Sequence, residues 1–550
     1  MGTMTSDQAA DTTTKTRLKL PKDRVAGLVQ NWRSDAISGF IVFLIALPLS
    51  LGIAIASGMP PLAGIFAAIV GGMVVSQLSG SFVTINGPAA GLIVVIVGAV
   101  EKLGGGDVGY HATLAAIAIS GILLFIMGLL KAGVLGNFFP GTVVHGMLAS
   151  IGIIIMSKQL PFVLGVKPPA KEPLMLIAKI PQMFMEMNPQ IATIGLTCLA
   201  ILIIHAVIKN RTIKKIPAAI IVVAVSVAMG FMFDLQHAHT YMFSGHEFKI
   251  DPKFLVMLPN SILSGITHPD WTQISSGVFW SCVISITLVQ GIETLLSAAA
   301  VDKLDTYKRQ SNLSRDVAAV GLGSAMSAMI GGLPMIAEIV RSSANVSNGA
   351  KTRWANFFHG TFMLVFVLVG AQLVDQIPLA ALAALLVFTG YRLAAPKVFM
   401  ETHKIGPEQT FLFVVTIITT LATDLLIGVG TGILCKFALH LLKGAEPQHL
   451  FSVKTEVQNP SPDTYVVLVQ SAAIFSNFIS LNRVLDKIPK GKNITVDLSK
   501  SKLVDHSVME HLHHLRREYV NSGGKFKTIG LDQHKRASQH PLASASLKSA

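Results

Sequence analysis

Charged residues are scarce in this chain of 550 residues, because only 13% are Asp, Glu, Lys or Arg while 51% are hydrophobic. Soluble domains carry about a quarter charged residues, which excludes a soluble globular protein for most of the length. A helix needs about 20 apolar residues to cross a bilayer. Long apolar runs recur at 37–56, 62–78, 88–100, 112–130, 191–208, 216–233, 277–300, 361–374, 379–391 and 410–435. We therefore expect a polytopic α-helical membrane protein, with further spans at 138–156, 317–331 and 334–347.

Cysteine is nearly absent as well. Cys198, Cys282 and Cys435 all lie in apolar runs, so they form neither a disulfide framework nor a set with metal-site spacing. The N-terminus lacks a short apolar segment followed by a small-residue cleavage site, so we expect no cleaved signal. A nucleophile, base and acid constellation is missing too. The sequence therefore predicts no enzyme, no metal and no cofactor.

Negative charge is the minority, and the net charge is +14. The basic residues are spread over the connections, so no nucleic-acid partner is expected. Cytoplasmic loops carry excess Lys and Arg, so the basic segment 1–33 places the N-terminus in the cytoplasm, and the loops 209–215 and 302–315 agree. The segment 158–188 also carries four lysines, although this topology places it outside. We expect a multi-pass protein of the cell (inner) membrane, embedded in lipid, with both termini cytoplasmic.

The apolar character ends near residue 443. Beyond it, YVVLV (465–469), NITVDLS (493–499) and FKTIGL (526–531) alternate like strands, and 475–488 and 507–520 have helical spacing. Alternating strands and helices predict a small α/β domain. The expected organisation is a cytoplasmic N-terminal segment (1–33), a transmembrane domain (34–443), a soluble domain (451–540) and a disordered tail (541–550).

Two apolar segments are interrupted by glycine and proline. In SFVTINGPAAGLIVVIVGAV (81–100), a β-like SFVTI precedes the breaker Asn86-Gly87-Pro88. In GGLPMIAEIVRSSANV (331–346), the chain breaks at GGLP and a short helix begins near Ile339. Non-helical backbone at membrane depth persists only inside protein or beside a watery cavity. One early and one late break are typical of inverted-repeat transporters with a site at the midplane, and a kinked packing helix is the alternative.

The second break also carries charge. A half-helix that begins inside the bilayer presents free N–H groups and the positive end of its dipole, and two such ends facing one another make an anion site. Arg341 adds a full positive charge one turn into the second half-helix. The alternative for Arg341 is a side chain that extends to the cytoplasmic interface.

Acidic residues occur nearby in apolar surroundings. Glu293 lies in a helical span, where a carboxylate is costly and usually functional, and Ser297 follows on the same helix face. This pair suits a sodium ion, or Glu293 carries a proton; a structural pairing with a cation or backbone group is the alternative. Glu338 lies three residues before Arg341, so it forms a local ion pair with Arg341 or takes part in coupling.

From about residue 30 to 540 the chain resembles the SulP family of inorganic anion transporters. ALPLSLGIAIASGMPPLAGIFAAIVGG (46–72) is similar to the family signature around the first two spans. SFVTINGPAAGL is similar to the third-span motif, and GGLPMIAEIVRSSANVSNGAKTRWA to the tenth-span motif. NITVDLSKSKLVDHSVMEHLHHL resembles the STAS module, but Asp505-His506-Ser507 only partly fits its phosphorylation motif, so no phosphoswitch is expected.

The resemblance implies fourteen spans in two inverted repeats of seven, arranged as a core and a gate domain, usually in a homodimer. A cytoplasmic STAS domain follows, with room for a cytoplasmic partner. Glu293 matches the acidic residue of the eighth span, and Ser297 the hydroxyl residue four positions later. Glu338 and Ile339 stand where sodium-coupled bicarbonate members have small or hydroxyl residues, which favours proton coupling or an altered cation site. The residues implied to face the anion are Asn86, Gly87, Ala89, Ala90, Ile339, Val340 and Arg341.

The function expected from this resemblance is secondary active transport of a small inorganic oxyanion, bicarbonate first and sulfate second. Coupling to sodium or protons and an alternating-access mechanism are part of that expectation. A nucleobase–proton symporter would use acidic residues in the same two spans, but Arg341 and the C-terminal domain argue against it. A channel-like anion conductor is a further alternative. A membrane-tethered signalling protein is the alternative from another class.

Overall fold

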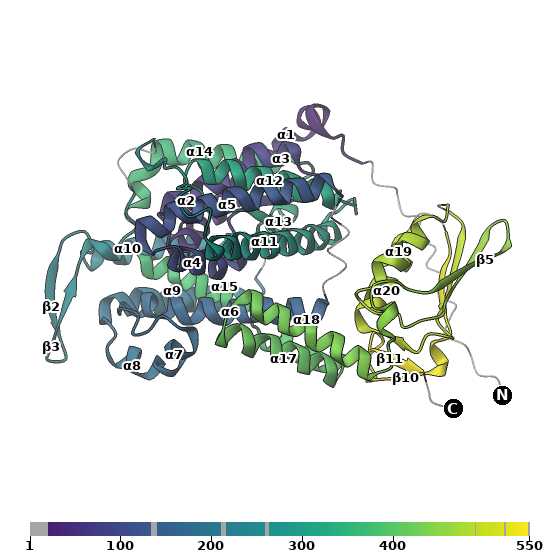
Figure 1. Cartoon of the computed structure of the whole chain (residues 1–550). Coiled ribbons are helices and arrows are strands. Elements are labelled where there is room, and N and C mark those ends of the chain that lie inside the picture. The colour runs from purple at the N-terminus through teal and green to yellow at the C-terminus, as the bar shows by residue number, and fades with distance from the viewer. Residues whose placement is uncertain are drawn as a thin grey trace.

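The computed structural model describes residues 20–131, 133, 140–210, 216–258, 263–489, 491–521 and 524–547. In these ranges a helical membrane domain precedes a small α/β domain (Figure 1). The helices of the membrane domain are α1 (Arg24–Ala56), α2 (Pro61–Val70), α3 (Ser76–Leu78), α4 (Ile93–Lys102), α5 (Gly106–Leu129), α6 (Gly141–Leu164), α7 (Pro173–Ala178), α8 (Ile180–Met185), α9 (Pro189–Val207), α10 (Ala218–Met232), α11 (Gly277–Leu304), α12 (Leu313–Met329), α13 (Ile339–Ser347), α14 (Trp354–Val374), α15 (Leu379–Leu393), α16 (Pro396–Ile405), α17 (Pro407–Ala422) and α18 (Leu425–Leu442).

The expected polytopic helical protein is confirmed. By length and composition, 8 helical segments of the described residues are able to cross a membrane, and the shorter helices α10, α14 and α17 are also apolar. Adding α12 and the half-length helices α4 and α13 gives the fourteen segments that the resemblance implies. Their number as true spans stays a prediction.

The membrane helices pack as two bundles, one above the other in Figure 1. The first, which we call the core, contains α1, α2, α4, α5 and α11 to α14; the second, the gate, contains α6, α9, α10, α15, α17 and α18. Each bundle takes helices from both halves of the chain, as inverted repeats do. Five of these helices, as far as the structure describes them, begin with a side chain that accepts a backbone N–H, which satisfies part of the free helix end: Asp23, Asn188, Ser276, Asn312 and Asp424.

The two ends of the helical bundles differ. The hairpin of β2 (His239–Phe243) and β3 (His246–Ile250) projects from one end, which we call the hairpin side (Figure 1). The α/β domain lies at the other end, which we call the terminal side. Asn188, at the start of α9, donates a hydrogen bond to the Lys249 carbonyl of the hairpin. The helix α9 therefore begins on the hairpin side and ends on the terminal side.

The C-terminal domain contains a four-stranded sheet in the order β5 (Thr455–Ser461), β6 (Thr464–Val469), β7 (Asn493–Asp497), β9 (Phe526–Ile529). The pairs β6–β7 and β7–β9 are parallel, and α19 (Phe478–Asp486) and α20 (His506–Asn521) supply the crossovers that parallel strands require. A second sheet has the order β10 (His534–Arg536), β11 (Ala545–Leu547), β8 (Leu503–Val504). This architecture fits the small STAS-type domain that the resemblance implies.

Three expectations about boundaries need correction. The first helix starts at Arg24, inside the segment 1–33 that was expected to precede the membrane domain; residues 1–19 lie outside the described ranges. The expected tail 541–550 contains β11, which is ordered because it pairs with β10 on one side and β8 on the other. The sequence predicts a β-like segment at 81–85. In the structure the strand is Ile85–Gly87, because these three residues pair with Ile336–Glu338.

A buried ion pair joins the last membrane helix to the C-terminal domain. The ammonium of Lys436 in α18 donates to Asp505 Oδ1 at 2.7 Å, and both side chains have no exposed surface. Burial alone would raise the pKa of Asp505, but the neighbouring Lys436 and His440 together outweigh this effect and hold that pKa well below its ordinary value. Phe437 packs against Phe475 beside this pair, with ring centroids 5.0 Å apart.

Helix α14 crosses the helical segment Pro61–Leu78 closely, and Gly72 and Gly360 lie at the point of contact. A Cβ at Gly360 would lie 2.8 Å from the Cα of Gly72, which belongs to the backbone and cannot yield. We therefore expect Gly360→Ala to lower the melting temperature of the detergent-solubilised protein, since overpacking costs about 1–3 kcal/mol. Gly98→Ala is the matched control, because a Cβ on this helical glycine of α4 meets nothing within 4 Å. Equal melting temperatures for the two variants would contradict the close contact between Gly360 and Gly72.

Candidate functional site

The two interrupted segments meet inside the core bundle. Strand β1 (Ile85–Gly87) pairs antiparallel with β4 (Ile336–Glu338), in the register Ile85↔Glu338, Asn86↔Ala337 and Gly87↔Ile336. A turn of 3-10 helix (Ala90–Leu92) and the half-helix α4 follow the first strand, while α13 follows the second directly. Part of the backbone of each break is thus satisfied by the other break, as the interior of a membrane protein requires.

Polar side chains hold this short sheet in place. Ser342 Oγ accepts a hydrogen bond from the Ile85 N–H at 2.9 Å, and Asn345 Nδ2 donates to the Val83 carbonyl at 2.8 Å. From the neighbouring helix α14, Asn356 Nδ2 donates to Asn86 Oδ1 at 3.1 Å. The polar residues around the breaks therefore bind backbone and fix the geometry of the two half-helices.

Neither half-helix is capped by a side chain at its start. Ala89 before the 3-10 turn and Glu338 before α13 form no side-chain cap hydrogen bond. The first N–H groups of each helix have no intrahelical acceptor, and the helix dipole adds partial positive charge there. Two electropositive helix starts are therefore present in one region, connected by the β1–β4 pair.

The guanidinium of Arg341 bridges the two breaks. It lies in the first turn of α13 with only 1% of the residue exposed, and its Nη2 donates to the Pro88 carbonyl at 3.1 Å. Its Nε and Nη1 have no hydrogen-bond partner. A Cβ at Gly87 would lie 2.6 Å from Nη1, so the missing side chain of Gly87 leaves space for the guanidinium. Arg341 therefore offers unsatisfied donors beside both helix starts.

Solvent reaches α13 from the terminal side. Ile339 and Val340, in the first turn of α13, are 41% and 39% exposed. A cavity of about 480 Å³ opens along one face of α13 and reaches the last turns of α9 and α15. Its lining residues are His205, Ala206, Val340, Ser343, Ala344, Ser347 and Arg392.

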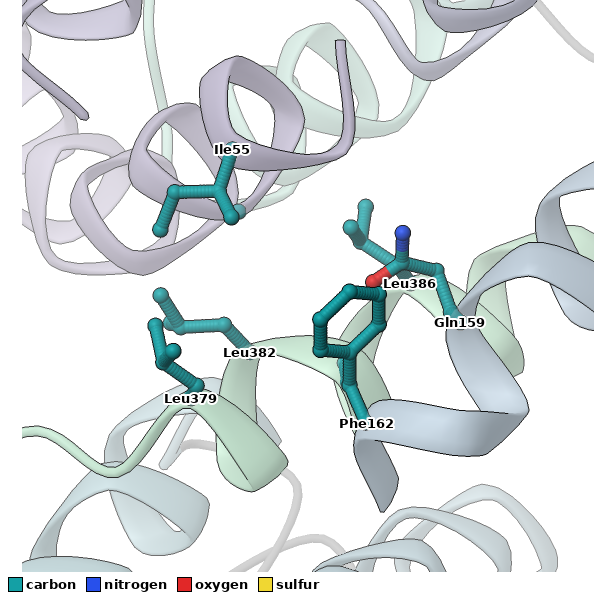
Figure 2. Close-up of a pocket in the computed structure, with 8 residues that line it drawn as sticks. Ile55, Gln159, Phe162, Leu379, Leu382 and Leu386 are labelled. Atoms are coloured by element: carbon teal, nitrogen blue, oxygen red, sulfur yellow. The ribbon is translucent and has the colours of Figure 1, made fainter. Parts of the chain in front are cut away.

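The hairpin side is closed between the same bundles. Figure 2 shows Ile55 of α1 facing Leu379 and Leu382 of α15, with Phe162 and Gln159 of α6 beside them. The gap among these side chains is only about 10 Å³, roughly the space of one water molecule. The structure is therefore open toward the terminal side and sealed by mostly apolar packing toward the hairpin side.

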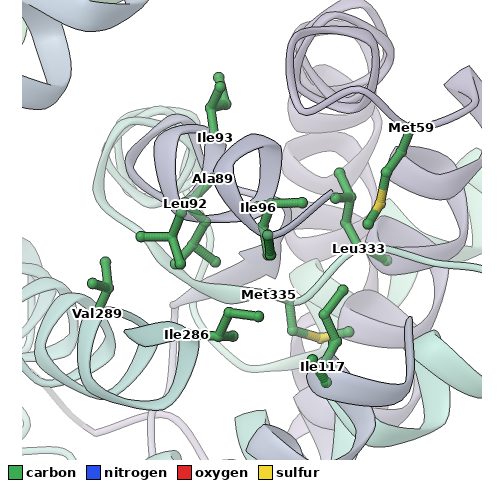
Figure 3. Packing of buried hydrophobic residues seen from close by; sticks show 14 of the residues in the cluster. Met59, Ala89, Leu92, Ile93, Ile96, Ile117, Ile286, Val289, Leu333 and Met335 are labelled. Atoms are coloured by element: carbon green, nitrogen blue, oxygen red, sulfur yellow. The ribbon is translucent and has the colours of Figure 1, made fainter. Parts of the chain in front are cut away.

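The residues predicted to face the anion do not share one environment. Asn86, Ala89 and Ala90 are 2%, 2% and 8% exposed, and Gly87 is buried. Figure 3 shows Ala89 and Leu92 within the apolar cluster that also contains Ile286 of α11 and Met335. The first break thus packs in the core, whereas Ile339 and Val340 of the second break border the open side.

Glu293 lies against the start of the first half-helix. Glu293 is 5% exposed, and its Oε1 has no hydrogen-bond partner. A Cβ at Gly91 would lie 1.8 Å from that oxygen, so Gly91 provides the space for the carboxylate. Ser297 is buried one turn later on α11 at 6% exposure. Among the described residues no hydrogen bond or ion pair satisfies Glu293, so the structural-pairing alternative finds no support.

The local ion pair between Glu338 and Arg341 is not formed. Their three-residue separation favours contact only if both lie on one helix. Glu338 instead ends strand β4, and α13 begins after it, while Arg341 turns toward Pro88. Among the described residues, no salt bridge connects Glu338 to Arg341.

Three residues near the breaks were not predicted. Asn356 contacts Asn86, and His359 on the same helix is fully buried with no partner for either ring nitrogen. Arg392 lines the cavity from α15. The signal available in the sequence was their polarity within apolar spans, which marks an intramembrane residue as a functional candidate.

Comparisons with known proteins agree with this geometry. The model described as the sulfate permease family matches residues 32–416, which is more than half of the chain. The chain belongs to this family. It is a membrane transporter of the family and not an enzyme, as the sequence predicted.

Two curated relatives cover most of the chain. A protein of Bacillus subtilis (strain 168) named putative sulfate transporter YvdB is 24% identical over 520 residues, which are 93% of this chain and 94% of the relative. The bicarbonate transporter BicA of Picosynechococcus sp. is 22% identical over 438 residues, covering 79% of this chain and 74% of the relative.

Solved structures share the fold. The transmembrane domain of a cyanobacterial bicarbonate transporter, BicA, aligns with a TM-score of 0.62 at 22% identity, covering 73% of this chain and 98% of that chain. The structure of SLC26A9 aligns with a TM-score of 0.63 at 15% identity, covering 92% of this chain and 85% of that one. The expected core-and-gate membrane fold is therefore confirmed.

Two alanine substitutions separate the roles of Arg341 and Glu293. Gly87→Ala displaces only the guanidinium, because the next atoms lie 3.8 Å away, and we expect anion affinity to fall about tenfold, or about 1.4 kcal/mol. Gly91→Ala displaces the Glu293 carboxylate instead, so we expect a changed cation dependence of uptake. Uptake by proteoliposomes at varied anion and cation concentrations measures both. Identical kinetics in the two variants would contradict separate sites.

Proposed function

We propose that this protein carries out secondary active transport of a small inorganic oxyanion, with bicarbonate the first candidate substrate and sulfate the second. The observation that carries the proposal is Arg341, whose Nε and Nη1 lack partners between two uncapped half-helix starts. An anion placed there gains charge-assisted hydrogen bonds that no described residue supplies. The names of the relatives, a putative sulfate transporter and a bicarbonate transporter, support the same two substrates.

Two residues of the second break are proposed to meet the anion from the open side. Ile339 and Val340 are exposed and belong to the first turn of α13, so their backbone N–H groups are available to an oxyanion. Asn86, Gly87, Ala89 and Ala90 are proposed to shape the opposite wall, although they are buried in this conformation. A rearrangement at the first break would be needed for direct contact with the anion.

Coupling to a cation is proposed to depend on Glu293, Ser297 and Glu338. Glu338 stands directly before α13, where a negative charge opposes the binding of an anion at the helix start. Glu293 lies against Gly91 at the start of the first half-helix, and Glu338 ends the strand that pairs with β1. A sodium ion or a proton bound in this acidic region would reduce the repulsion, so the anion and the cation would bind together.

Alternating access is proposed as the transport mechanism. The cavity on the terminal side and the closed packing on the hairpin side are compatible with one end state, open toward the C-terminal domain. The opposite state would require the core to move against the gate, so that Ile55 separates from Leu379 and Leu382. Rigid-body movement of two repeats around a fixed site is the usual solution in transporters of this kind.

The surrounding arrangement is part of the same proposal. We place the protein in the cell (inner) membrane, with the terminal side and both chain ends in the cytoplasm, and with two copies forming a homodimer. The anion would then leave or enter the cytoplasm through the cavity beside Arg392. The C-terminal domain would be available to a cytoplasmic partner.

Glu293→Gln tests the coupling role. The amide keeps the size of the carboxylate but cannot hold a proton exchangeably and binds sodium more weakly, so gradient-driven accumulation should be lost. Exchange of labelled for unlabelled anion should persist, because the proposed anion site at Arg341 is unchanged. Glu247→Gln, on the exposed hairpin, is the control for removal of one carboxylate. Accumulation at the wild-type level in Glu293→Gln would contradict the coupling proposal.

Substrate and coupling ion are separated by one uptake experiment. Proteoliposomes receive labelled bicarbonate or labelled sulfate, while sodium and proton gradients are imposed one at a time. We expect bicarbonate uptake to exceed sulfate uptake and to respond to one of the two gradients. Failure of both anions to enter would contradict the proposed function, whereas sulfate uptake alone would reverse only the order of substrates.

A further inference from the structure

A second cluster of buried polar groups lies far from the anion site, at the junction with the C-terminal domain. It contains Glu408 in the first turn of α17, His440 in the last turn of α18 and Asp505 immediately before α20. One ligand atom from each residue lies within 4.8 Å of the other two. The side chains are 7%, 1% and 0% exposed, respectively.

Each carboxylate of this cluster has one occupied oxygen and one bare oxygen. Lys436 donates to Asp505 Oδ1, whereas Asp505 Oδ2 has no partner. Lys443 and Ser544 donate to Glu408 Oε2, whereas Glu408 Oε1 has no partner. The two carboxylates are therefore held by donors on one side and present an unsatisfied oxygen on the other.

The imidazole of His440 completes the set. Neither ring nitrogen makes a hydrogen bond, and Nε2 lies 3.5 Å from Asp505 Oδ1, beyond good hydrogen-bond geometry. Its ring lies beside Phe475, with centroids 5.7 Å apart, so water has little access from that side. Buried polar atoms without partners cost free energy, and each of the three residues of this cluster has at least one.

We propose that this junction is a metal site, in which Glu408 Oε1, a ring nitrogen of His440 and Asp505 Oδ2 bind a divalent transition-metal ion such as Zn²⁺. A mixed set of one imidazole and two carboxylates suits zinc-type ions better than calcium or magnesium, which prefer all-oxygen sites. The groups that donate to Asp505 Oδ1 and Glu408 Oε2 correspond to the hydrogen-bond partners that orient metal-binding carboxylates in known metal sites.

Charge and distance set the strength of such a site. Lys436 and Lys443 already balance the two carboxylates, so the ion adds positive charge and its affinity is moderate. Ligand atoms on zinc lie about 2.0–2.2 Å from the ion, so small side-chain rotations must bring the three atoms closer together. The side chain of Lys443 is 30% exposed and can move toward solvent, whereas Lys436 is fixed by burial.

The proposed ion would connect two gate helices to the C-terminal domain. Glu408 and His440 come from α17 and α18, and Asp505 comes from the segment that leads into α20. Metal binding would therefore restrain the C-terminal domain against the gate, independently of the anion that occupies the core.

Zinc titration of the full-length, detergent-purified and chelator-stripped protein tests the proposal. We expect one saturable site by calorimetry and a higher melting temperature with zinc. His440→Ala should weaken zinc binding at least tenfold. His246→Ala, which removes an exposed histidine of the hairpin, should leave binding unchanged. Lys443→Gln should tighten binding severalfold, because it removes the competing positive charge beside Glu408.

Every outcome of the zinc titration supports or contradicts the proposed metal site. Absence of saturable zinc binding to the folded wild-type protein overturns the site, and so does binding that His440→Ala leaves unchanged in a folded variant. If His440→Ala does not fold, Lys443→Gln decides, because unchanged or weaker zinc affinity contradicts the proposed ligands. The readout is metal binding, so a failed transport assay does not affect it.

Discussion

The structure depends on one constraint, which is that a broken helix inside a bilayer must satisfy its bare backbone within the protein. The two breaks satisfy one another, through three paired residues in each of β1 and β4. Ser342, Asn345 and Asn356 take up further groups around them. Because each break needs the other, the starts of the two half-helices are fixed together, and their positive ends occupy one region of the core.

The charged side chains follow from this fixed geometry. Arg341 fits beside the first break because Gly87 lacks a side chain, and Glu293 fits beside the first half-helix because Gly91 lacks one. Both groups keep bare polar atoms in spite of burial, which is costly unless a bound ion supplies the missing partner. A site with unsatisfied donors on one side and an unsatisfied carboxylate on the other suits the joint binding of an anion and a cation.

The sequence predicted features that depend on local pattern. Glycine, proline and charge identified both breaks, and the helix start near Ile339 agrees with α13. In the C-terminal domain, both helices and the three strands β6, β7 and β9 were located to within a few residues, whereas β5, β8, β10 and β11 were not predicted. Contacts between distant residues were not predictable, such as Asn356 with Asn86 or the cluster of Glu408, His440 and Asp505. Of the two alternatives for Glu338, the local ion pair with Arg341 is not formed, because the chain becomes helical only after Glu338.

Thiol accessibility at the start of α13 tests the central claim most directly. In Val340→Cys, bicarbonate or sulfate should slow modification by a small thiol reagent from the terminal side, and the added substitution Arg341→Ala should abolish that protection. Ser347→Cys, at the end of α13 in the same cavity, should react at the same rate with and without the anion. Anion protection that persists without Arg341, or that is equal at both positions, would contradict binding between the two half-helices.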